Sequence, residues 1–194
     1  MNDFWFYIKL GYEHVLDVTA YDHILFLSAL AVPYTFKSWK QVVILATIFT
    51  IAHCTSLALS AFGILSVRVT LIEFLIPITI ALTTLFNIYH SINQNENTNL
   101  LFASLATLFF GFVHGFGFSN YFNMLMAEEK QKLWSLLGFA MGIEFSQVTI
   151  IMLVLFFAWL LQHVLAIKKL YFIVGASILI LFITLPILLR SSPF

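Results

Sequence analysis

Long apolar segments with few charged residues are the sequence feature that most limits what this chain can fold into. A helix needs ~20 apolar residues to cross the hydrocarbon core of a bilayer, which is about 30 Å thick. Six segments approach or exceed that length: approximately residues 21–36, 41–64, 67–89, 99–118, 133–162 and 170–189. The sequence therefore predicts an all-α transmembrane bundle with about six spanning helices.

Composition supports lipid as the main solvent of this bundle. Charged residues make up 9% of the 194-residue chain, whereas roughly 25% is usual in soluble domains, whose surfaces must face water. The formal net charge is zero, so there is no basic surface of the kind that binds nucleic acid. The predicted partner is instead the lipid bilayer, in a multi-pass arrangement.

The N-terminal residues are expected to remain in the mature protein. Asp3, Lys9 and Glu13 interrupt their apolar pattern, and no basic segment precedes an apolar core as in a cleavable signal. We expect this stretch to extend the first spanning helix or to lie along the interface as an amphipathic helix. The chain has no linker or low-complexity segment, so residues 1–194 are predicted to form one domain.

The ionisable residues of the apolar segments share a predicted depth. Because successive helices alternate in direction, the start of an odd-numbered helix lies at the same membrane face as the end of an even-numbered one. The residues that follow this pattern are Asp22, His23, His53, Glu73, His114 and Glu144. A charged side chain at bilayer depth costs a few kcal/mol on insertion scales, so each of these residues needs a partner or a function.

Local spacing predicts that several of these side chains face the inside of the bundle. Thr50, His53, Ser56 and Ser60 recur at intervals of three and four, which places them along one helix face. A similar stripe contains Thr70, Glu73, Pro77 and Thr84, and Glu144 shares a face with Gln147.

Two GxxxG spacings lie beside the predicted polar set. One covers residues 111–115 around His114, and the other covers residues 138–142 just before Glu144. Small residues at this interval let helices approach closely. We therefore expect the side chains of His114 and Glu144 to come within reach of one another.

Imidazole and carboxylate groups together suit borderline divalent ions such as nickel, cobalt, zinc, iron or copper(II). Copper(I) prefers sulfur, and Cys54 is the only cysteine. The predicted metal ligands are Asp22, His23, His53, His114 and Glu144, and the secondary candidates are His14, Glu73 and Gln147. The same residues without a metal could form a proton relay.

Five strings in the chain resemble the HupE/UreJ family of small bacterial membrane proteins. In order they are GYEHVLDVTAYDHILFL, FTIAHCTSLAL, VTLIEFLIPITIAL, GFVHGFGFS and GFAMGIEFSQ, over about residues 11–147. The resemblance implies a nickel or cobalt permease, or an accessory protein of metalloenzyme maturation. It also implies the bacterial inner membrane as location and a maturation partner or another membrane protein as a candidate partner.

The metal motifs proposed for that family are a His five residues before an Asp-His pair, and a His-Gly string followed closely by Glu. The resemblance carries these roles onto His14, Asp22, His23, His114 and, less directly, Glu144. Seven residues separate His14 from Asp22, and the GFVHGFGFS string lacks the nearby Glu. The chain therefore resembles a divergent branch, and the choice among nickel, cobalt, zinc and copper stays open.

Three functions are compatible with these residues. The first is a permease or metal-capture protein, which would not be an enzyme. The second is an intramembrane metalloenzyme, in which three His ligands and a water would resemble a catalytic zinc site. The third is an assembly partner of a membrane complex, with the polar residues serving as interhelical hydrogen bonds. In that third case the histidines would be satisfied by neighbouring hydroxyl or carbonyl groups, and Asp22 would cap a helix. An oligomer is compatible with all three.

Overall fold

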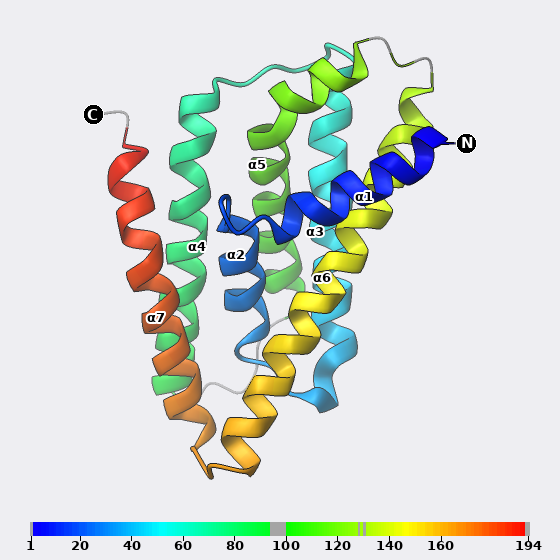
Figure 1. Cartoon of the computed structure of the whole chain (residues 1–194). Coiled ribbons are helices and arrows are strands. Elements are labelled where there is room, and N and C mark those ends of the chain that lie inside the picture. Colours follow the sequence, from blue (N-terminus) through cyan, green and yellow to red (C-terminus); the bar gives the residue numbers. More distant parts are fainter. Residues whose placement is uncertain (1, 94–99, 128, 130, 193–194) are drawn as a thin grey trace.

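The computed structural model describes residues 2–93, 100–127, 129 and 131–192, and its regular elements are helices (Figure 1). In chain order they are α1 (Asn2–Leu16), α2 (Asp22–Ala31), the 3₁₀ turn η1 (Phe36–Ser38), α3 (Trp39–Ala61), α4 (Val69–Ile92), α5 (Leu100–Met126), α6 (Lys132–His163) and α7 (Lys169–Arg190). The long helices α3 to α7 run roughly side by side along one axis, as expected for a membrane bundle.

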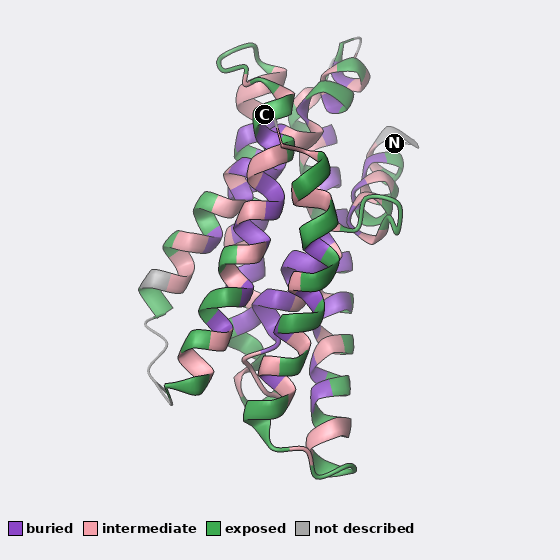
Figure 2. Cartoon of the chain, turned by 90° about the vertical axis from the view of Figure 1, so that its left-hand side faces the viewer, coloured by how far each residue is buried: buried purple, intermediate pink, exposed green. Residues whose placement is uncertain are grey.

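Four segments of the described chain are long and apolar enough to cross a membrane: Phe36–Ala61, α4, α6 and α7. Large apolar side chains cover their outer faces, including Ile51, Phe157 and Phe182, which is 72% exposed. Figure 2 shows this distribution, with buried residues inside and exposed ones on the outward faces. Such an exterior suits lipid. The expectation of about six spans is thus supported for four segments, while α5 has 27 residues and falls in the same length range.

The first predicted span differs from the expectation. Instead of one segment over 21–36, the structure has α2 with 10 residues, which at 1.5 Å per residue reaches about 15 Å, half of a bilayer core. A turn after Leu16 separates α2 from α1, so α1 does not extend it. In Figure 1, α1 crosses the bundle obliquely and α2 descends from the end of α1 towards the opposite end of the bundle. The helix α2 therefore begins partway along the length of the bundle rather than at its end.

Close helix packing explains how α1 is held. It packs along α6, where glycines remove the side chains that would keep the two helices apart. A Cβ added at Gly142 would collide with backbone atoms of Ile8 and Tyr12, and one at Gly138 would approach the carbonyl oxygen of Phe4. The second GxxxG spacing thus serves the contact between α1 and α6.

The first GxxxG spacing serves a different pair of helices. Gly111 and Gly115 of α5 pack against the backbone of Phe49 and His53 on α3, and α3 and α5 form the most extensive helix pair. The expectation that His114 and Glu144 come within reach of one another required the two glycine motifs to pack α5 against α6. Instead, each motif packs against a different helix. Sequence spacing identifies a close-packing face but not the helix that fills it.

The two predicted polar stripes have different outcomes. On α3, Thr50, His53 and Ser56 are buried, as predicted. On α4, Thr84 is buried but Glu73 is exposed. Figure 1 shows the physical reason: the short helix α2 packs beside α4 only below this level, so the first turns of α4 lack that neighbour.

Candidate metal centre

Four histidines from four different helices meet inside the bundle. His14 lies in the last turn of α1, His23 is the second residue of α2, His53 lies on α3 and His114 on α5. The docking of α1 on α6 and of α5 on α3 brings these residues together. The glycine contacts that shape the bundle therefore also build the cluster, which we call the histidine cluster: His14, His23, His53 and His114.

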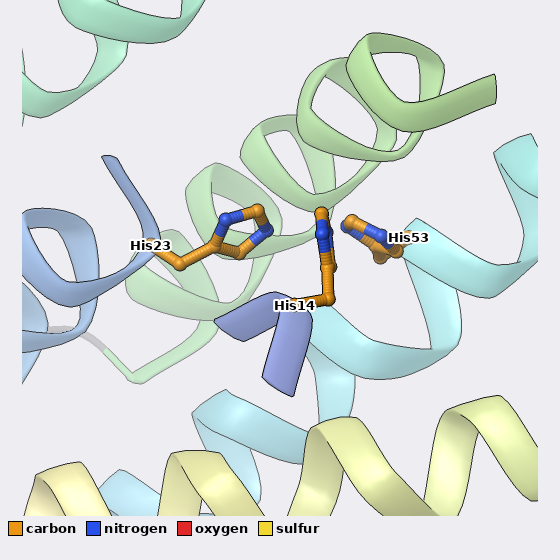
Figure 3. Close-up of side chains that lie close together, drawn as sticks. All are labelled: His14, His23 and His53. Carbon is orange, nitrogen blue, oxygen red and sulfur yellow. The ribbon is translucent and has the colours of Figure 1, made fainter. Parts of the chain in front are cut away.

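Three of these histidines have the spacing of a potential metal site. His14, His23 and His53 each offer one ligand atom within 4.8 Å of the other two (Figure 3). Ligand nitrogens bound to one tetrahedral zinc ion are roughly 3.4 Å apart, given Zn–N bonds of about 2.0–2.1 Å. Side-chain rotations that move the nitrogens by about 1 Å would close this difference.

The fourth histidine lies beside this group of three. The ring centroid of His114 is 5.4 Å from that of His23, close to the 5.5 Å between His23 and His53. The Nδ1 atom of His114 is 2.9 Å from the carbonyl oxygen of Phe110. Because a carbonyl only accepts, this nitrogen carries the proton and the Nε2 atom keeps its lone pair. Nε2 is therefore the nitrogen of His114 whose lone pair is available.

Burial makes these imidazoles unusual. His53 has no exposed surface, and His114 and His23 are 1% and 3% exposed. Five ring nitrogens of the cluster have no partner: one in His14, one in His23, two in His53 and one in His114. The other nitrogen of His23, Nδ1, faces the carboxylate of Asp22 at 3.4 Å. A buried polar atom without a partner costs about 1–3 kcal/mol. Neighbouring protein groups therefore satisfy only part of the hydrogen-bonding capacity of these rings.

The carboxylate of Asp22 lies beside the histidine cluster. The Oδ1 atom of Asp22 is 3.4 Å from the Nδ1 atom of His23, and the Asp22 carboxylate also interacts electrostatically with His114 and His14. A carboxylate beside the second nitrogen of a ligand histidine orients the ring and raises its basicity. Asp22 lies in the first turn of α2, where its negative charge also offsets the positive end of the helix dipole.

His14 is neutral at physiological pH. Burial lowers the pKa of His14 to about 3, and the neighbouring His23 adds to the effect. Neutral imidazole is the form that binds a metal ion. The sequence made His14 a secondary candidate because it precedes the spanning segments, but α1 folds back over α6 and carries it into the cluster.

Glu144 lies outside the group of three histidines and contacts threonines on α3. Its carboxylate accepts hydrogen bonds from Thr50, at 2.7 Å, and from Thr47, at 2.5 Å. It also interacts electrostatically with Cys54, the neighbour of His53 in sequence. The sequence did not predict Thr47 and Thr50 as partners of Glu144, although Thr50 belongs to the polar stripe predicted on α3. Gln147, one turn further along α6, is fully buried, and its amide oxygen and nitrogen have no hydrogen-bond partner.

The fold and the cluster together define a class: a membrane protein whose apolar helices surround a group of closely spaced histidines. The comparison with protein families narrows the class. The model of the family described as HupE / UreJ protein matches residues 1–190, so the chain belongs to the HupE/UreJ family. No curated protein and no solved structure matches it.

Proposed function

We propose that this protein binds a divalent transition-metal ion at the histidine cluster and moves it across a bacterial inner membrane. The observation that carries the proposal is the set of buried ring nitrogens in the histidine cluster that have no hydrogen-bond partner, five besides the His23 Nδ1 that faces Asp22. A metal ion would use lone pairs that are otherwise costly to bury. Membership of the HupE/UreJ family, whose members are associated with nickel or cobalt uptake or with metalloenzyme maturation, points the same way.

The donor set favours nickel, cobalt or zinc as the ion. Imidazole nitrogen is the main ligand type, and the cluster contains no sulfur; the single cysteine, Cys54, is buried beside Glu144. Imidazole and carboxylate suit borderline divalent ions, whereas copper(I) selects thiolate and thioether. His14, His23, His53 and His114 are the proposed ligands, and Asp22 is proposed to orient His23 or to bind the ion directly.

Charge balance assigns proposed roles to the carboxylates. Four neutral imidazoles leave both positive charges of the ion uncompensated in a medium of low polarity. Asp22 would compensate one charge beside the cluster. Glu144, held by Thr47 and Thr50, would contribute at longer range, and Gln147 offers a neutral amide further along α6.

Metal binding to purified full-length protein tests the proposal. We expect about one equivalent of Ni²⁺, Co²⁺ or Zn²⁺ by isothermal titration, and loss of at least about tenfold in affinity when His23, His53 or His114 is replaced by alanine. His163 provides the control, because its Nδ1 atom lies 3.1 Å from the carbonyl oxygen of Trp159, in the last turn of α6. The His163→Ala variant should bind like the wild type.

Transport is tested separately in proteoliposomes. We expect uptake of radioactive Ni²⁺, Co²⁺ or Zn²⁺ that is lost in the His53→Ala variant. Binding without flux for any of the three ions would reject the permease and favour a capture protein or an intramembrane enzyme. Absence of binding in wild-type protein would reject the metal centre itself.

A further inference from the structure

A cavity with a mixed apolar and polar lining lies in the bundle beside the histidine cluster. A cavity of about 830 Å³ is enclosed by α2, α4, α5 and the start of α7. Its mouth includes Gln41 and Lys169, which are exposed and stand at the starts of α3 and α7. Both helices begin at the end of the bundle opposite the loop between α3 and α4 (Figure 1). The cavity therefore reaches this end of the bundle, and the exposed side chains of Leu82 and Phe86 on α4 also border it.

The inner wall of the cavity carries buried polar groups. Thr107 of α5 and Asn87 of α4 border it and are 2% and 6% exposed. The amide of Asn87 donates a hydrogen bond of 2.7 Å to the carbonyl oxygen of Ala29, so this wall is fixed to α2. These polar groups offer water hydrogen-bond partners inside a wall that is otherwise mainly apolar, with Phe26, Leu30 and Ile173. At about 30 Å³ per molecule, the volume has room for on the order of 25 waters, more than the hydration shell of one divalent ion needs.

A thin aromatic layer separates this cavity from the histidine cluster. Phe26 of α2 borders the cavity, and its ring centroid lies 5.3 Å from that of His114 on the other side. Phe110 also borders the cavity, and its carbonyl oxygen is the partner of His114 Nδ1. Phe26 packs edge-on against Phe110 at 5.7 Å and stacks on Phe49 at 4.9 Å. One layer of rings thus lies between the proposed ligands and the cavity.

We propose that this cavity is the second compartment of the metal's path and that Phe26 is the barrier between it and the histidine cluster. This proposal rests on the proposed metal transport. It adds the end of the bundle at which the ion is released and the residue that blocks its passage until then. Apolar constrictions block ions because an ion cannot keep its water there. Among the described residues, those that line the cavity include no aspartate or glutamate. An ion that passes Phe26 would therefore regain water and meet a single imidazole, that of His90, and no carboxylate among the described lining residues.

Thiol labelling tests the compartment without any metal. In a Cys54→Ala background, Thr107→Cys is treated with a membrane-impermeant sulfonate-bearing methanethiosulfonate from each side of oriented vesicles. Gln41→Cys marks the mouth, and Ser66→Cys, an exposed position between α3 and α4, marks the opposite end. We expect Thr107→Cys to react from the Gln41 side and not from the Ser66 side. No reaction from either side, as in a lipid-filled cavity, or reaction from the Ser66 side would overturn the compartment.

Ion leak tests the barrier. Proteoliposomes that contain Phe26→Ala should lose trapped Ni²⁺ at least about tenfold faster than wild type, because a smaller side chain lets water enter the constriction. Phe122→Ala is the matched control, since Phe122 is a buried ring that packs on Phe118 and Phe139 and does not border the cavity. Phe26→Leu serves as the milder variant if Phe26→Ala does not fold.

The outcomes separate this proposal from the proposed function. If either Phe26 variant folds and leaks no faster than Phe122→Ala, Phe26 is not the barrier. If the wild type binds no metal, the metal centre fails, and the labelling result still decides whether the cavity is a water-filled compartment.

Discussion

The imidazole rings of His14 and His23 lie with their centroids 4.6 Å apart, one at the end of α1 and the other at the start of α2. The turn between these helices is held by Asp17, whose carboxylate accepts hydrogen bonds of 2.8 Å and 2.6 Å from the backbone and hydroxyl of Thr19. Such a side-chain turn reverses the chain locally. Half of the histidine cluster is therefore assembled within one short segment, and the other half arrives from α3 and α5.

The carboxylate of Asp22 should control affinity rather than stoichiometry. It lies 3.4 Å from His23 Nδ1, and loss of such a partner typically lowers metal affinity about 10–100-fold. We expect Asp22→Asn to weaken Ni²⁺ or Zn²⁺ binding by this factor in titration calorimetry, with one equivalent still bound. Glu13→Gln is the control, because the exposed carboxylate of Glu13 pairs with Lys9 at 3.6 Å on α1. Equal affinity of both variants would remove Asp22 from the site.

Docking of α1 should be required for the contribution of His14. In Gly142→Ala, the new methyl group would collide with the backbone of Ile8 and Tyr12, so we expect a loss of about 1–3 kcal/mol in stability together with weaker metal binding. In Gly175→Ala the new methyl group meets no atom within 4 Å, and a helical alanine is favoured over glycine by roughly 0.5–1 kcal/mol. Thermal unfolding in detergent and metal titration measure both effects. Metal affinity unchanged in a destabilised Gly142→Ala would contradict a role for α1 in the site.

Glu144 should contribute to stability and charge balance without being a direct ligand. Replacing its carboxylate with an amide leaves one oxygen to accept from Thr47 or Thr50 and removes the negative charge. The other threonine would then donate to its own helix carbonyl and accept from the new amide. We expect Glu144→Gln to lower stability by about 1–3 kcal/mol and to keep metal binding within about tenfold of wild type. Thr50→Val should produce a similar loss of stability, less than additive in the double variant. Complete loss of bound metal in Glu144→Gln would return this residue to the ligand set.

Bound metal should stabilise the fold. An ion that binds only the folded state adds about 2.7 kcal/mol at a free concentration of 100 times its Kd. We therefore expect Zn²⁺ or Ni²⁺ to raise the unfolding temperature and a chelator to reverse the rise. His53→Ala should show no rise, because His53 is fully buried and both of its ring nitrogens are unpaired. A rise of equal size in His53→Ala would place the stabilising ion elsewhere.

Sequence alone determined the class of structure and the polar residues that need an explanation. Low charge and long apolar segments require lipid as solvent, and a histidine in such a segment is costly whatever its neighbours are. His23, His53 and His114 could therefore be selected, together with the inward face of α3, from helix periodicity. Family resemblance supplied His14, which the residue pattern alone placed at the interface.

Tertiary structure decided which partners each of these residues meets. The GxxxG spacings show where helices approach, but only the packed bundle shows that Gly142 receives α1 and Gly115 receives α3. For that reason Glu144 contacts threonines of α3, and Glu73 lies exposed on α4 above the short helix α2. Periodicity is a property of one helix, whereas a site needs the relative placement of several, and that placement depends on side-chain packing between segments far apart in the chain.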